Sequence, residues 1–85
     1  MCKNFQKSLG ENLRKIRHEK ALSQEYVSLE SGISRSHIAM IESGKRDVTV
    51  TNLFKISRAL QVQMQDIFAF DNLQEYKFDV DELYK

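Results

Sequence analysis

The sequence predicts an all-α fold of five short helices, and three observations support this prediction. Proline is absent from the 85 residues, so no ring interrupts a helix interior. Apolar residues recur at spacings of three and four, which is the period of an amphipathic helix. Residues that cap helices well stand between these runs. The length suits one small domain, and hydrophobic residues at 41% with charged residues at 29% are typical of a globular one.

The first helix is expected over residues 5–20. Phe5, Leu9, Leu13 and Ile16 share one face at helical spacing, and the charged residues between them occupy the other faces.

The second and third helices are predicted on either side of a glycine. Ser23 is a good N-cap for a helix that stops at Gly32, because glycine readily adopts a positive φ. Ser34 caps the next helix, residues 34–43, which ends before Gly44.

A fourth helix is predicted from the cap Thr49 to about Leu60, and a short fifth helix over 64–68. Residues 71–85 fit two patterns. Their aromatic and aliphatic residues alternate with charged ones, as in a strand, but they also fit a helical stripe. We favour a strand-like arm.

The net charge of +1 hides a strong asymmetry along the chain. Residues 1–46 hold nine Lys/Arg and five Asp/Glu, a net charge of +4. Residues 47–70 are balanced, and residues 71–85 carry −3. A basic first half followed by an acidic arm favours a nucleic-acid partner for that first half.

Residues 23–45 have the pattern of a helix-turn-helix motif. Two short helices meet at a tight turn, and Val27, Ile33, Ile38 and Ile41 would fix the angle between them. In this motif the second helix enters the major groove of DNA. Its polar outer face is therefore the predicted reading surface.

Three elements of the pattern in residues 13–68 are specific: Ser-Gln at 23–24, Gly-Ile at 32–33 and Ile-Glu-x-Gly-Lys at 41–45. With them the chain resembles the XRE family of bacterial and phage regulators, the lambda repressor and Cro group. Its small size also resembles that of restriction–modification controller proteins. The resemblance implies a five-helix lambda-repressor-like DNA-binding domain over residues 1–70, with a short C-terminal arm at 71–85.

The resemblance also implies roles for single residues. Gln24 matches a position that binds a DNA phosphate in the family. Arg35 and Ser36 match the first positions of the recognition helix that contact bases. Arginine can bond O6 and N7 of guanine together. The remaining predicted DNA contacts are Ser34, His37, Met40, Ser43, Lys45 and Arg46.

Five further positions concern stability. By the resemblance, Arg17 and Glu42 form a structural ion pair. Position 28 is commonly alanine in the family but is Ser28 here, and its hydroxyl could bond a preceding carbonyl. Ala21 and Gln61 replace glycines at helix ends. A left-handed backbone at either residue would cost roughly 1 kcal/mol.

We expect a sequence-specific transcriptional regulator that binds double-stranded DNA as a homodimer. Two-fold symmetry would place its recognition helices on half-sites about 34 Å apart in a palindromic or repeated operator. The apolar surplus near the C-terminus predicts the dimer surface, with the arm adding to it. The predicted dimer residues are Val62, Met64, Ile67, Phe68, Phe70, Tyr76 and Phe78.

Other functions have less support in the sequence. No Cys/His cluster has metal-ligand spacing and no glycine-rich loop suits a phosphate, so we expect neither an enzyme nor a cofactor. No apolar run approaches the ~20 residues of a membrane span. We expect a cytoplasmic protein, encoded by a bacterium or a phage. The alternative is an antitoxin or interaction module whose acidic arm binds a protein.

Overall fold

The computed structural model describes residues 4–70, and this part of the chain is all-helical. The helices are α1 (Phe5–Glu19), α2 (Gln24–Ser31), α3 (Arg35–Glu42), α4 (Val50–Leu60) and α5 (Met64–Ile67). The all-α prediction is confirmed, and the predicted helices lie where the sequence placed them. The predicted arm at 71–85 lies outside the described residues. No helix within residues 4–70 is long and apolar enough to cross a membrane.

The predicted cap residues begin three of these helices. The side-chain oxygen of Ser23 accepts a hydrogen bond from the N–H of residue 26 at 2.9 Å. Ser34 and Thr49 accept the equivalent bonds at 3.2 Å and 3.0 Å. Each bond satisfies one of the backbone donors that a helix leaves open at its first turn.

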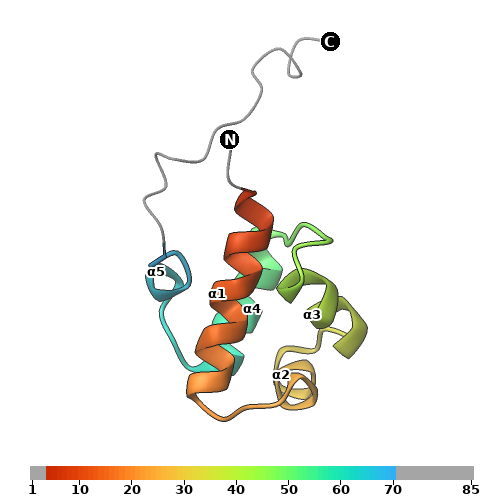
Figure 1. Cartoon of the computed structure of the whole chain (residues 1–85). Coiled ribbons are helices and arrows are strands. Elements are labelled where there is room, and N and C mark those ends of the chain that lie inside the picture. Colours follow the sequence, from red (N-terminus) through yellow and green to blue (C-terminus); the bar gives the residue numbers. More distant parts are fainter. Residues whose placement is uncertain (1–3, 71–85) are drawn as a thin grey trace.

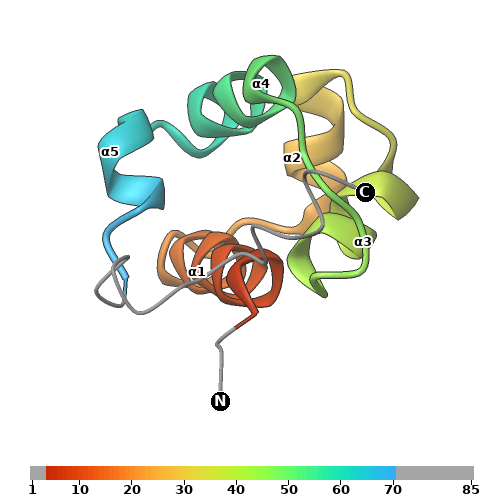
Figure 2. The ribbon, with the colours of Figure 1, turned by 90° about the horizontal axis from the view of Figure 1, so that it is seen from above.

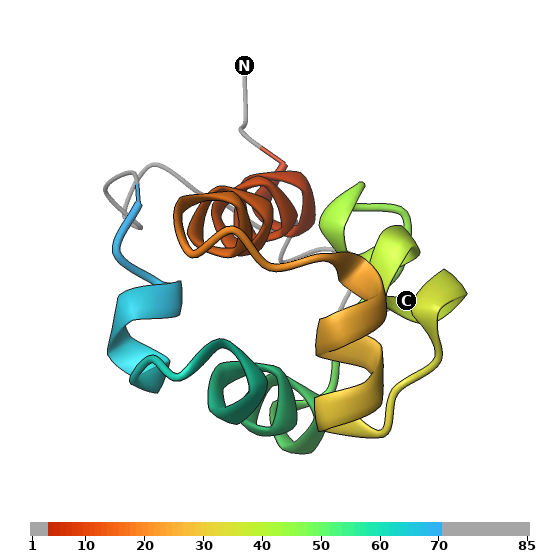
Figure 3. The ribbon, with the colours of Figure 1, turned by 90° about the horizontal axis from the view of Figure 1, so that it is seen from below.

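The helices surround one core. Helix α1 lies in front of α4, with α5 on one side and α2 and α3 on the other (Figure 1). The same arrangement is seen from above in Figure 2 and from below in Figure 3. Helix α1 contacts α3 and α5, and α4 contacts α2 and α5. The buried apolar residues are Leu9, Leu13, Ile16, Val27, Ile33, Ile38, Ile41, Leu53, Ile56, Ala59, Leu60 and Ile67.

Gly10 allows the backbones of α1 and α3 to approach closely. A Cβ atom at this position would clash with the carbonyl oxygen of Ile41 and would lie 2.5 Å from that of Glu42. Any side chain larger than hydrogen would therefore push the end of α3 away from α1. This fixed distance sets where α3 sits on the domain.

The backbone is left-handed at two residues that are not glycine. Ala21 has φ 56° and Gln61 has φ 60°. Both follow helix ends, where a left-handed residue turns the chain away from the helix axis. Each residue therefore carries the cost of roughly 1 kcal/mol that a residue other than glycine incurs in a left-handed backbone.

Ile67 is wrongly placed in the predicted dimer surface. It is 0% exposed and belongs to the core of its own chain, because α5 turns this side chain toward α1 and α4. The amide of Asn12 donates to the carbonyl oxygen of Ile67 at 2.6 Å and holds α5 against α1. Ile67 can support an interface from beneath but cannot touch a partner.

Candidate nucleic-acid interface

Two serines hold the turn between α2 and α3. The Ser28 hydroxyl donates to the carbonyl oxygen of Ile33 at 2.6 Å, and Ser31 Oγ accepts from the N–H of Ile33 at 3.2 Å. The expected bond from Ser28 to a preceding carbonyl is therefore wrong. Gly32, with φ 76°, reverses the chain and brings the later carbonyl over α2. The turn that aims α3 is tied directly to α2.

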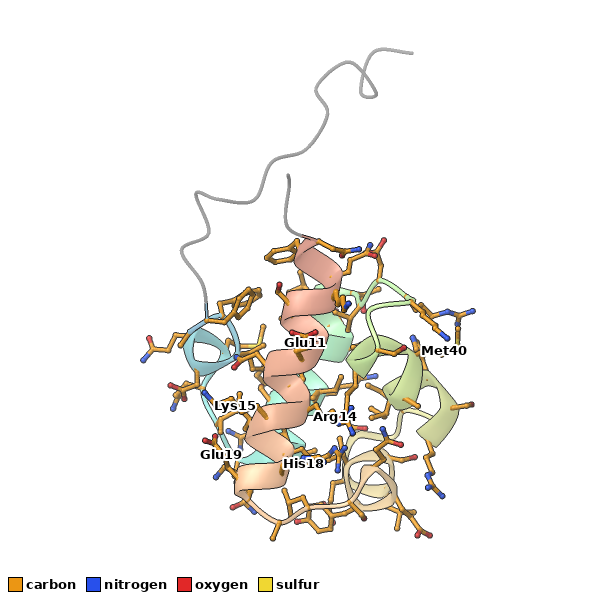
Figure 4. All side chains as sticks on the ribbon, viewed as in Figure 1. Glu11, Arg14, Lys15, His18, Glu19 and Met40 are labelled. Carbon is orange, nitrogen blue, oxygen red and sulfur yellow. The ribbon has the colours of Figure 1, made fainter. Side chains whose placement is uncertain are left out.

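Helix α3 divides into an inner and an outer face. Ile38 and Ile41 are buried in the core, whereas Arg35 and Ser36 are exposed. Met40 is 37% exposed and extends away from the helical cluster in Figure 4. The fold thus uses one side of α3 and leaves the other side accessible.

The side chains at the start of α3 differ in how free they are to contact a ligand. Within residues 4–70, the side chains of Arg35 and Ser36 have no hydrogen-bonding or ionic partner. Ser34 accepts the capping bond, and its hydroxyl retains its O–H donor and a second lone pair for another contact. His37 is half-buried. Arg35 and Ser36 are the groups best placed to reach a ligand beyond α3.

A buried polar network joins α1, α2 and α3. Arg17 Nε lies 2.8 Å from Glu42 Oε2, and Nη2 lies 2.9 Å from Oε1. The predicted ion pair is therefore present. Gln24 Nε2 also donates to Glu42 Oε1 at 3.1 Å. An amide nitrogen carries two N–H groups, so Glu42 fixes Gln24 through one and leaves the other for an outside acceptor.

The loop after α3 is anchored to α1 and exposes two cations. Gln6 donates to the carboxylate of Asp47 across the gap between the two segments. The Ser43 hydroxyl donates to the carbonyl oxygen three residues back at 3.0 Å, so a phosphate contact from Ser43 would have to replace this bond. Lys45 and Arg46 are exposed and make no ion pair within the described chain.

The predicted contact residues thus lie on three consecutive segments: the start of α2, the outer face of α3 and the following loop. Arg35, Lys45 and Arg46 add positive charge that no carboxylate in residues 4–70 neutralises by pairing. Helix N-termini and unpaired cations suit phosphate oxygens, and an exposed helix suits a groove. This arrangement fits a polyanion with an accessible groove.

The fold and this surface define a helix-turn-helix protein of the DNA-binding class. A family model described as helix-turn-helix, HTH_3, matches residues 13–67. The chain therefore belongs to this XRE-type helix-turn-helix family, as the sequence resemblance implied.

Several relatives are named controller proteins. Control protein C.BamHI of Bacillus amyloliquefaciens is 38% identical over 74 residues, which cover 86% of this chain and 91% of that protein. Control protein C.MunI of a Mycoplasma species is 39% identical over 61 residues, covering 71% and 82% of the two chains.

Solved structures of controller proteins also match this chain. The restriction–modification controller protein C.AhdI from Aeromonas hydrophila matches with a TM-score of 0.71 and 35% identity, covering 73% of this chain and 94% of that one. The C.Esp1396I tetramer, solved with its natural 35-base-pair operator, matches with a TM-score of 0.70 and 31% identity, covering 78% and 88%.

Sequence reasoning missed an apolar pair on α4 and one cation of α1. Val50 and Phe54 of α4 are 77% and 54% exposed. Their four-residue spacing on the side of α4 away from Leu53 and Ile56 could have identified them as an outward apolar pair. The cation is Arg14 of α1, which lines a hollow together with Gln24.

Proposed function

We propose that this protein is a sequence-specific transcriptional regulator that binds double-stranded DNA with α3 in the major groove. The observation that carries the proposal is the division of α3. Its inner face is fixed in the core, while Arg35 and Ser36 at its start are exposed and without partners in residues 4–70. Residues at the N-terminal end of a recognition helix are those that meet base edges.

The residues around α3 suit the phosphate backbone. Gln24 stands at the N-terminus of α2 with one N–H held by Glu42, and it is proposed to bind a phosphate with the other. Lys45 and Arg46 follow the end of α3 and would bind the phosphates beyond the groove. Such contacts set the register of the protein on DNA, whereas Arg35 and Ser36 would read sequence.

The comparisons support this function. C.Esp1396I, which matches most of this chain, was solved as a tetramer on its operator. C.BamHI and C.MunI are named as control proteins. We therefore propose that this chain is likewise a controller-type regulator of a bacterium or phage, acting in the cytoplasm where its DNA lies, and that it is not an enzyme.

We further propose that the functional unit is a homodimer. One recognition helix contacts too few base pairs for useful specificity, whereas two-fold symmetry doubles the site. We include Val50 and Phe54 of α4 in the proposed interface, because both are large apolar side chains that the fold leaves exposed. Val62, Met64, Phe68 and Phe70 are half-buried against the core, and part of each remains accessible.

The test is selection of bound duplexes from a pool with about 25 randomised base pairs, followed by sequencing. The expected result is one enriched motif, palindromic or directly repeated, with half-sites about 10 base pairs apart. Tight binding without an enriched motif would reject sequence-specific regulation. An enriched single half-site would reject the homodimer and keep the role of α3.

A further inference from the structure

A hollow lies between α1, the start of α2 and the end of α3. It is lined by Arg14, Arg17, Gln24, Ala39, Glu42 and Ser43. The small side chain of Ala39 leaves room between the longer ones. The hollow borders the proposed phosphate ligand Gln24 on the side toward α1.

The charges around this hollow do not cancel. Arg17 and Glu42 neutralise each other in a bidentate pair. Arg14 is exposed and has no hydrogen-bonding or ionic partner within residues 4–70. The hollow therefore carries one uncompensated positive charge, and Arg14 supplies it.

Figure 4 places Arg14 on the edge of α1 that faces α3, whereas Lys15 lies on the edge toward α5. Two neighbouring cations of one helix thus point to different sides of the molecule. Of these two cations, Arg14 lines the hollow with Gln24 and Lys15 does not.

We propose that Arg14 is a further DNA-binding residue, which binds the phosphate held by Gln24 or the next one along the same strand. This inference rests on the proposed function. Guanidinium groups bind phosphate oxygens through two parallel N–H bonds. Since Glu42 already fixes Gln24 and occupies Arg17, Arg14 is the group in this hollow whose charge is available to DNA.

The experiment measures the salt dependence of binding to a fluorescein-labelled duplex of about 30 random base pairs, which requires no knowledge of the operator. The full-length variants are R14Q, R14K and, as matched control, K15Q. All three proteins are first checked for unchanged thermal melting. Each lost phosphate contact removes about 0.9 from the slope of log affinity against log salt.

R14Q is expected to bind several-fold more weakly and to lose about 0.9 of this slope, with R14K retaining the slope and K15Q unchanged. Equal slopes for R14Q and K15Q would overturn the assignment of Arg14 and leave the proposed function standing. A wild-type protein whose DNA binding ignores salt would overturn the proposed function itself.

Discussion

Arg17 and Glu42 are joined by two parallel hydrogen bonds of 2.8 Å and 2.9 Å, and both side chains are buried. The pair connects the last turn of α1 to the last residue of α3, and Glu42 also accepts from Gln24 of α2. One carboxylate thus holds three helices. Its two oxygens fix both the recognition helix and the residue proposed to bind phosphate.

Removal of this carboxylate should be strongly destabilising. Glu42→Ala leaves the buried guanidinium of Arg17 without its counter-ion, and we expect a loss of about 3 kcal/mol or more in the free energy of unfolding. Urea denaturation measures this loss. The control Glu11→Ala removes an exposed carboxylate of α1 and should change stability by less than about 0.5 kcal/mol. Similar losses for both variants would contradict the role of the ion pair.

Gly10→Ala should also destabilise the domain. The added methyl group meets two backbone carbonyl oxygens at the end of α3, and overpacking of this kind costs about 1–3 kcal/mol. The matched control is Lys15→Ala on the same helix, where the side chain is exposed. Since alanine is the better helix former, a more stable Gly10→Ala protein would show that α1 and α3 do not approach as described.

Gln61→Gly should stabilise the protein. Gln61 has φ 60°, and glycine adopts this conformation without the steric cost of up to about 1 kcal/mol that other residues incur. Thermal melting measures the gain. Arg58→Gly, at an exposed position in the last turn of α4, should instead lose about 1 kcal/mol. A loss in both variants would argue against the left-handed turn.

Substitutions of Arg35 and Gln24 should have different effects on sequence specificity and on overall DNA affinity. Arg35→Ala should lower affinity for the selected sequence by about 1–3 kcal/mol and relax the preference at one base pair. Gln24→Ala should weaken selected and random duplexes alike, because phosphates carry no sequence information. Fluorescence anisotropy on the two duplexes gives both values. Equal losses on both duplexes for both variants would show that the roles are wrongly assigned.

Substitution of Phe54 tests the proposed dimer surface. This side chain is 54% exposed on α4, so Phe54→Glu should leave the monomer folded and weaken self-association at least ten-fold. Sedimentation equilibrium measures the association. Leu29→Glu, on α2 at 77% exposure, serves as a matched control and should associate normally. A wild-type chain that is monomeric at micromolar concentration would reject the homodimer.

The helices could be predicted because their signals are local. Ser23, Ser34 and Thr49 cap helices through bonds to residues three positions away, and the apolar stripes follow the helical period. The ion pair between Arg17 and Glu42 was available only through the family resemblance, since 25 residues separate the two side chains.

What could not be predicted depends on how distant segments meet. The bond from Gln24 to Glu42 and the closeness of Gly10 to α3 arise only when three helices pack together. The buried position of Ile67 is not predictable from the sequence, because a helix of four residues is too short to show which side faces inward. In the sequence Arg14 is one of several cations of its helix, and only the packing of α1 against α2 and α3 brings it to the hollow that Gln24 also lines.

The two faces of α3 carry separate tasks, and this has an evolutionary consequence. Ile38, Ile41 and Glu42 hold the helix in place, whereas exposed Arg35 and Ser36 contribute almost nothing to the core. Mutations at the outer positions can therefore change the preferred sequence while the domain keeps its stability. A lineage of such proteins could diverge to new operators through single substitutions, and a designer could transplant the outer residues of one relative onto this scaffold.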